Sequence, residues 1–91
     1  MSEEIVISFA GVSHVIEAER LLSEAGFSAG VMPVPGAIGA GCGFCLRVPS
    51  GQAVEVCRWM RERGVPYSAV YAKEERPGGD VYVPFEAGGS S

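Results

Sequence analysis

The feature that most constrains this chain is an uncharged stretch from Ala25 to Leu46. A stretch of this length could form a membrane-spanning helix, but residues that break helices interrupt it throughout. Those residues are Gly26, Gly30, Pro33, Pro35, Gly36, Gly39, Gly41 and Gly43. The chain offers no neighbouring spanning helix that would satisfy the backbone groups freed at these breaks. We therefore predict a strand, a glycine-rich loop and a second strand, with no membrane partner.

The remaining apolar patterns predict two further strands and two helices. The predicted strands are Ile5–Phe9, Phe27–Val34, Phe44–Val48 and Tyr67–Ala72. Apolar residues recur at helical spacing from the candidate N-cap Ser13 to Gly26, and again from Gln52 to Arg63 before Gly64. The order is β-α-β-β-α-β, which predicts an α+β, ferredoxin-like fold: a four-stranded antiparallel sheet with both helices on one face. Because Pro33 and Pro35 lack amide donors, this strand is expected to lie at a sheet edge or to end early.

The length of 91 residues fits a single core. We place that domain at residues 1–73. Residues 74–91 are charged and then rich in glycine and serine, which predicts a loosely ordered C-terminal tail. A domain this small gains stability by pairing, so we expect a homo-oligomer, most simply a dimer.

Charge and cysteine content narrow the possible partners and the compartment. Seven Lys and Arg face eleven Asp and Glu, for a net charge of −4. This charge argues against nucleic acid and anionic membranes as partners. The first residues, MSEEIV, lack the basic and apolar regions of a secretory signal, so we expect a cytoplasmic protein. Three cysteines in that compartment are expected to be free thiols.

The loop between the second and third predicted strands is the candidate site. Its glycines, including Gly39, Gly41 and Gly43, allow the backbone N–H groups to converge on an anion or a thiolate. Cys42 lies at the end of this loop. A thiol becomes a useful nucleophile when a helix N-terminus or nearby cations lower its pKa. The alternative is a flexible hairpin loop that contains a cysteine by chance.

The predicted topology brings other polar residues to the same end of the sheet. Ser13 and His14 would lie beside the loop at the start of the first helix, and Arg61 and Arg63 at the end of the second. Arg47 is the basic residue that follows the loop in sequence. These side chains would assist anion binding. The arginines of the second helix are equally explained as solvated charges that match the helix dipole.

Cys42 and Cys45 form a C-x-x-C pattern, but its setting fits neither zinc nor thioredoxin chemistry well. A structural zinc site needs four ligands, and no second close pair exists. In thioredoxin-like motifs the cysteines lead into a helix, whereas here they lead into a predicted strand. We expect Cys45 and Cys57 to pack as small buried residues. No metal site and no cofactor are predicted, and a redox pair of Cys42 and Cys45 remains a third possibility.

Several of these segments together resemble the small bacterial family described as selenium/sulfur carrier protein-like. The matching residues are Phe9, Ser13, Ala18-Glu19-Arg20-Leu21-Leu22, Glu24-Ala25-Gly26, Pro33-Val34-Pro35, Ile38, Cys42-Gly43 and Leu46-Arg47. The resemblance covers roughly Ile5 to Tyr71. It implies a carrier that holds sulfur or selenium on Cys42 as a persulfide or selenosulfide, and that exchanges it with donor and acceptor proteins.

The chain departs from the family pattern at three positions. The basic residue that commonly follows the P-V-P segment is Gly36 here, and the acidic position after it is Ala37. Any anion contact made there is absent. Cys45 stands where the family usually has Ala, and it could act as a resolving thiol that releases the carried atom by forming a disulfide.

The sequence thus supports two main hypotheses of different classes. The first is a cytoplasmic carrier with Cys42 as the reactive thiol, which is closer to a binding protein than to a turnover enzyme. The alternative is a non-enzymatic, ferredoxin-like module that binds a small anion or regulates through dimerisation. Replacing Cys42 distinguishes them, because only the carrier depends on that thiol.

Overall fold

One antiparallel sheet organises the chain, with its strands in the order β2-β3-β1-β4-β5. The computed structural model describes residues 4–36 and 43–85. Along the chain the elements are β1 (Glu4–Ser8), α1 (Val12–Glu24), β2 (Gly30–Pro33), β3 (Phe44–Pro49), the short 3₁₀ helix η1 (Ser50–Gln52), α2 (Ala53–Glu62), β4 (Ala69–Arg76) and β5 (Gly79–Pro84). The predicted α+β class is confirmed, and β2 lies at a sheet edge as its prolines predicted.

The central strand β1 joins the two halves of the sheet. It pairs with β3 on one side and with β4 on the other, so that Ser8 lies opposite both Cys45 and Ala69. Its middle residues Ile5, Val6 and Ile7 are fully buried. A β-branched run of this kind is typical of a strand with neighbours on both sides.

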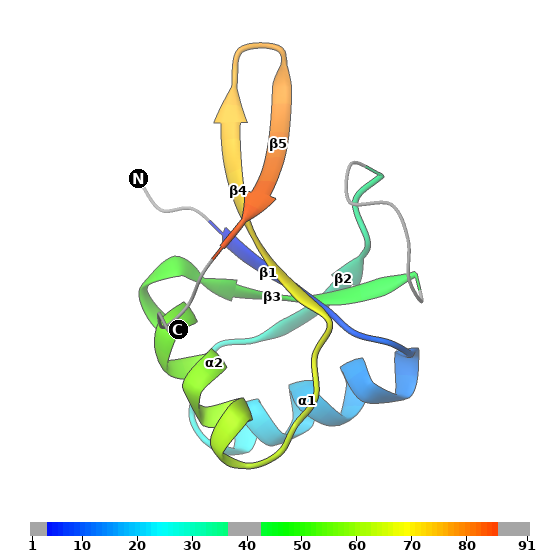
Figure 1. The fold of residues 1–91 in the computed structure, drawn as a ribbon, viewed down its shortest axis with the longest axis vertical. Helices are drawn as coiled ribbons and strands as arrows, with labels where there is room; N and C mark the ends of the chain where they lie inside the picture. The colour runs from blue at the N-terminus through cyan, green and yellow to red at the C-terminus, as the bar shows by residue number, and fades with distance from the viewer. Residues whose placement is uncertain (1–3, 37–42, 86–91) are drawn as a thin grey trace.

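Both helices pack against the same face of the sheet (Figure 1). The sheet contributes the alternating residues Ile5, Ile7, Leu46 and Val48 to the core. The helices contribute Val15, Ala18, Leu22, Ala53, Val56, Cys57 and Met60. These positions follow the helical spacing that the sequence shows, which is why the apolar pattern located the two helices.

Glycine ends both helices in the predicted way. Gly26 follows α1 with a φ of 97°, and Gly64 follows α2 with a φ of 74°. The next residue then closes the turn: Phe27 N–H donates to the Leu22 carbonyl at 3.0 Å, and Val65 N–H donates to the Met60 carbonyl at 2.8 Å. These bonds satisfy carbonyls that the helix end would otherwise leave free.

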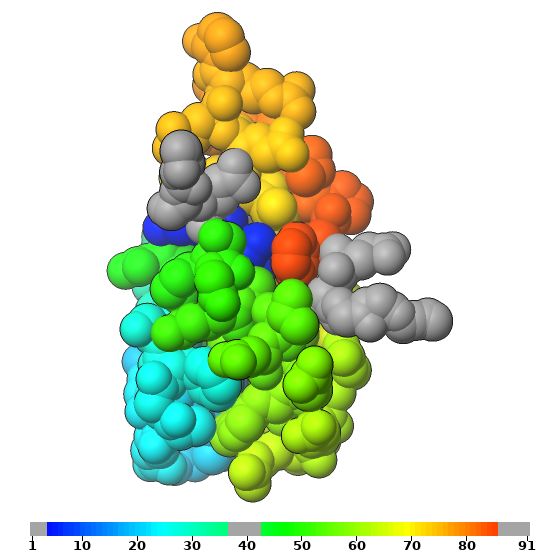
Figure 2. All heavy atoms as spheres, turned by 90° about the vertical axis from the view of Figure 1, so that its left-hand side faces the viewer, coloured from blue at the N-terminus to red at the C-terminus, as the bar shows by residue number. Residues whose placement is uncertain are grey.

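The expected four-stranded sheet is wrong in strand count, because β4 continues to Arg76 and a fifth strand follows. Part of the segment that we expected to be a tail therefore forms a β-hairpin. This hairpin extends beyond β1 and protrudes from the body of the molecule (Figure 2). The charges that suggested a tail lie on a two-stranded ribbon, where Lys73 contacts Asp80 and Glu4 at 3.9 Å each.

The second strand is also shorter than predicted. Only Gly30–Pro33 pairs with β3, whereas Phe27 and Ala29 pack against the hydrophobic core before the strand begins. Phe27 meets Trp59 of α2 edge to face, with ring centroids 6.2 Å apart. None of the described helices is long and apolar enough to cross a membrane.

Truncating Leu22 should destabilise the fold much more than truncating Ile16 on the same helix. Leu22 is fully buried, whereas Ile16 is 58% exposed. We expect Leu22→Ala to lower the free energy of unfolding by about 2–5 kcal/mol, and Ile16→Ala by less than about 1 kcal/mol. Urea denaturation followed by circular dichroism measures both. Equal losses in the two variants would contradict the described core.

Candidate functional site

The candidate site lies where β2 ends and β3 begins. Of the predicted loop residues, Gly39, Gly41 and Cys42 lie outside the described residues, whereas Gly43 and the residues that flank the loop are described. The described parts of the candidate site are the Gly43 junction, the two other thiols, the start of α1 and the end of α2.

Gly43 forms the junction between the loop and β3. Its carbonyl accepts a hydrogen bond from Val34 N–H at 3.0 Å, next to the final ladder pair of Pro33 and Phe44. Its φ of 95° is a conformation that residues with a Cβ rarely adopt. The glycine after Cys42 is therefore required by the backbone, and the bond to Val34 anchors the loop at the sheet.

Cys45 is fully buried on β3, as its position in the strand predicted. Its thiol donates to the Pro33 carbonyl, with an Sγ–O distance of 3.9 Å. Ser8 of β1 and Met32 of β2 lie opposite it on the two neighbouring strands. A reagent or partner protein reaches this thiol only if the sheet opens locally.

Cys57 is buried on α2 within the hydrophobic core. Burial raises the pKa of its thiol, because the low-polarity core disfavours the thiolate. The positive charge of Arg61 and a hydrogen bond with Tyr67 act in the opposite direction and only reduce that rise. Cys57 is therefore an unreactive core residue, as the sequence suggested.

The first helix begins differently from the prediction. Gly11, not Ser13, is the N-cap, and no side chain caps the helix. Ser13 is instead an exposed residue of the first turn. That turn contains no acidic residue. The positive end of the α1 dipole therefore lies, without a compensating carboxylate, at the end of the sheet where β3 starts (Figure 1).

His14 lies beside the end of α2, as the topology predicted. It lines a cavity of about 260 Å³ together with Arg63, and a second cavity of about 170 Å³ together with Tyr67. The Arg63 guanidinium stacks on the Trp59 ring, 4.9 Å from its centroid, and Arg61 donates to the Tyr67 hydroxyl at 3.4 Å. Both arginines thus have structural contacts within the helix end.

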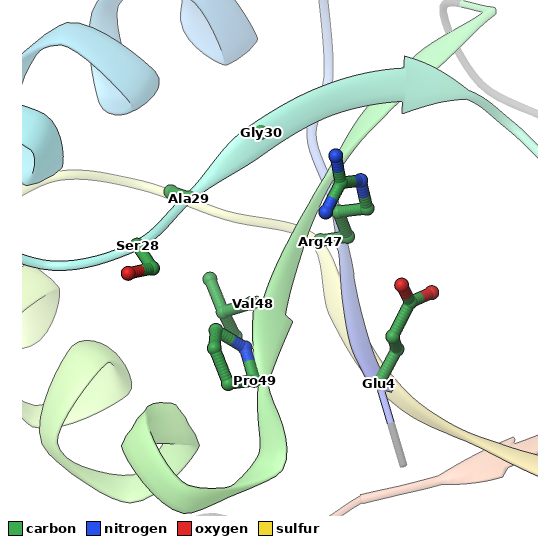
Figure 3. A pocket seen from close by; sticks show the side chains of 7 residues that line it. All are labelled: Glu4, Ser28, Ala29, Gly30, Arg47, Val48 and Pro49. Carbon is green, nitrogen blue, oxygen red and sulfur yellow. The ribbon is translucent and has the colours of Figure 1, made fainter. Parts of the chain in front are cut away.

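Arg47 lies further along β3 and faces a different groove. Its guanidinium covers Gly30 so closely that a Cβ there would lie 3.2 Å from it. The groove has a volume of about 340 Å³ and also contains Glu4 (Figure 3). The structure therefore does not bring Arg47 into the cavities that His14 lines. Glu4 and Gly30 were not predicted as residues of a site, because their proximity to Arg47 arises only from strand register.

Metal-binding side chains do not converge within residues 4–36 and 43–85: no three His, Cys, Asp or Glu residues there form a group that could hold an ion.

Replacing Gly43 by Ala should destabilise the protein through backbone strain alone. Among the described residues, no atom lies within 4 Å of the position of an added Cβ, so the expected cause is the backbone conformation. We expect a loss of about 1–2 kcal/mol in the free energy of unfolding. Gly36→Ala is the matched control, since Gly36 has equally open space and no positive φ. An equal effect of both substitutions in urea melts would contradict the described junction.

The raised pKa of Cys57 predicts a loss of stability at alkaline pH. The unfolded thiol ionises near its ordinary pKa of about 8.5, while the buried thiol resists ionisation. This contribution to stability is therefore complete below that pH and is lost as the pH rises through the higher pKa of the folded state. Urea melts should show a steeper alkaline decline for the wild type than for Cys57→Ala. Parallel pH profiles would contradict the assignment.

The comparisons with known proteins agree with the resemblance seen in the sequence. A family model described as "Putative Se/S carrier protein-like" matches residues 4–72, from β1 into β4. No curated protein and no solved structure matched the chain. The family match covers the junction, both helices and the core, and ends before the protruding part of the β4–β5 hairpin. The chain therefore belongs to the Se/S carrier protein-like family.

Proposed function

We propose that the protein carries sulfur or selenium on Cys42 and passes it between other proteins. Family membership suggests the carrier function. The observation that supports Cys42 as the carrying thiol is the complete burial of Cys45 and Cys57. A carried atom must be reached by a donor and then by an acceptor, and these two thiols are enclosed in the sheet and the core. Cys42 is the thiol that remains for this role.

The surroundings of the Gly43 junction favour a thiolate at the neighbouring position. The α1 N-terminus lies at this end of the sheet without an acidic residue in its first turn. Its positive dipole end stabilises a nearby negative charge and so lowers the pKa of a thiol. A lower pKa increases the thiolate fraction at neutral pH, and the thiolate is the nucleophilic form.

Loading proceeds by transfer of a sulfane sulfur from a persulfide of the donor protein. The Cys42 thiolate attacks the outer sulfur of the donor persulfide, a new S–S bond forms, and the donor's S–S bond breaks. The donor cysteine leaves as a thiolate, so no external oxidant or reductant is needed. The reverse exchange delivers the sulfur to an acceptor thiol, and a selenium atom would follow the same course.

Cys45 can serve as the resolving thiol of this carrier. Attack of the Cys45 thiolate on the inner sulfur of a Cys42 persulfide would form a disulfide and release hydrosulfide. Because Cys45 is buried and hydrogen-bonded to Pro33, this step requires local opening of the strand ends. We therefore propose transfer to another protein as the main route and release through Cys45 as a slower one.

Exposed apolar side chains support docking to a protein at this end. Four of the five large exposed apolar residues that the structure describes lie on α1, β2 or the start of β3. They are Val12, Ile16, Val31 and Phe44. Phe44 directly follows Gly43. Apolar residues beside a reactive group suit contact with donor and acceptor proteins or with a second copy in a dimer.

We also propose that β1 to β4 and the two helices form a ferredoxin-like core. The β-α-β-β-α-β order and the sheet order β2-β3-β1-β4 support this assignment. In this proposal β5 is an addition at the sheet edge beyond the family match. A carrier of persulfides also agrees with the predicted reducing, cytoplasmic setting.

Persulfide loading tests the proposed function. Wild-type protein incubated with a persulfide donor should gain the mass of one sulfur in intact-mass spectrometry, and peptide mapping should locate that sulfur on Cys42. Cys42→Ser should gain none, whereas Cys45→Ser and Cys57→Ser should load like the wild type. Loading that persists in Cys42→Ser would contradict the proposal, as would a fully reduced wild type that never loads.

A further inference from the structure

A second site lies at the other end of β3, where β2 separates from it. The ladder between these strands ends at the pair of Gly30 and Arg47. Before it, Ser28 N–H donates a hydrogen bond to the side-chain oxygen of Gln52 at 2.9 Å and not to β3. The separation leaves an open groove of about 340 Å³, which we call the β2–β3 notch. It is lined by Glu4, Ser28, Ala29, Gly30, Arg47, Val48 and Pro49 (Figure 3).

Arg47 provides a cation that lies against Gly30 and has no ionic partner among the described residues. Its guanidinium packs against Gly30, where any larger residue would push it away. Within the described part of the chain, no carboxylate lies within 4.0 Å of it, unlike Arg20 and Arg76, which form ion pairs. A guanidinium presents a rigid fork of N–H donors that matches a carboxylate.

Glu4 provides an anion on the same side of the notch. It lies opposite Pro49 on β1, which makes it a diagonal neighbour of Arg47 on one face of the sheet. The two side chains extend into the same space without forming a salt bridge with each other (Figure 3). The cation nearest to Glu4 in the described part is Lys73, at 3.9 Å, which leaves carboxylate oxygens able to accept further hydrogen bonds.

We propose that the β2–β3 notch binds a free L-α-amino acid with an apolar side chain. The ligand's carboxylate would pair with Arg47, and its ammonium group with Glu4. Ala29 and Pro49 offer apolar surface to its side chain. A ligand that carries both charged groups on one carbon fits two unlike charges that share a groove but form no salt bridge with each other.

This site is separate from the proposed carrier thiol. Gly43 and Arg47 are four residues apart in sequence, or roughly 13 Å along an extended strand. The inference therefore does not rest on the carrier function. Amino-acid binding should be the same in Cys42→Ser as in the wild type, so that the two proposals can fail independently.

Titration with L-methionine, followed by amide NMR, tests the notch. We expect shifts of the Ser28, Gly30 and Val48 amides with a dissociation constant on the order of 1 mM or tighter. L-Methionine amide lacks the carboxylate and N-acetyl-L-methionine lacks the ammonium group, so each should bind at least about tenfold more weakly. Equal binding of the N-acetyl compound would indicate a simple carboxylate site and overturn the proposal. The absence of shifts at about 20 mM ligand would also overturn it.

Two substitutions and a matched control complete the experiment. Arg47→Gln and Glu4→Gln should each weaken L-methionine binding at least about tenfold. Arg58→Gln removes another exposed arginine, on α2 and outside the notch, and should bind like the wild type. The amide spectrum of each variant without ligand verifies that it is folded. Unchanged binding in folded Arg47→Gln would refute the assignment of the carboxylate partner.

Discussion

The structure depends on the pairing of β1 along both of its edges. Ser8 lies opposite Cys45 on one side and Ala69 on the other, and Ser68 N–H donates to the Ser8 carbonyl at 2.7 Å. This strand therefore fixes three things at one end of the sheet: the start of β3, the start of β4 and the short connection to α1. The Gly43 junction and the N-terminus of α1 lie at the same end of the sheet, because β1 ends there and leads into α1.

Two of the three thiols of this small domain are buried. Cys57 lies in the core, where loss of solvation disfavours its thiolate, and Cys45 lies in the sheet with its proton directed at a backbone carbonyl. Both positions follow from apolar periodicity. The remaining thiol precedes a glycine whose backbone angle no other residue adopts easily. The burial of these two thiols supports the proposal that Cys42 is the reactive one.

Periodicity and glycine placement made the helices predictable, whereas features that depend on pairing between distant strands were not. Gly26 and Gly64 ended the helices as expected, and the prolines identified the edge strand. The β4–β5 hairpin escaped prediction because residues 73–76 are a continuous run of charges followed by a proline and glycines, a composition that resembles a solvated tail. Ser13 was a reasonable cap by residue type, but Gly11, which has an extended backbone, is the N-cap, so the helix starts earlier. The proximity of Glu4, Gly30 and Arg47 follows from register, which a single sequence does not specify.

We propose that Cys42 is the thiol available to partner proteins, because Cys45 and Cys57 are both buried. Competitive alkylation of the native protein with isotope-coded reagents, followed by peptide mass spectrometry, measures the rate at each cysteine separately. We expect rapid labelling of Cys42, with an apparent pKa below the ordinary thiol value of about 8.5. Cys45 and Cys57 should react only at the rate at which the fold opens. Labelling of Cys42 that is no faster than that of the two buried thiols would contradict its proposed role as the reactive thiol.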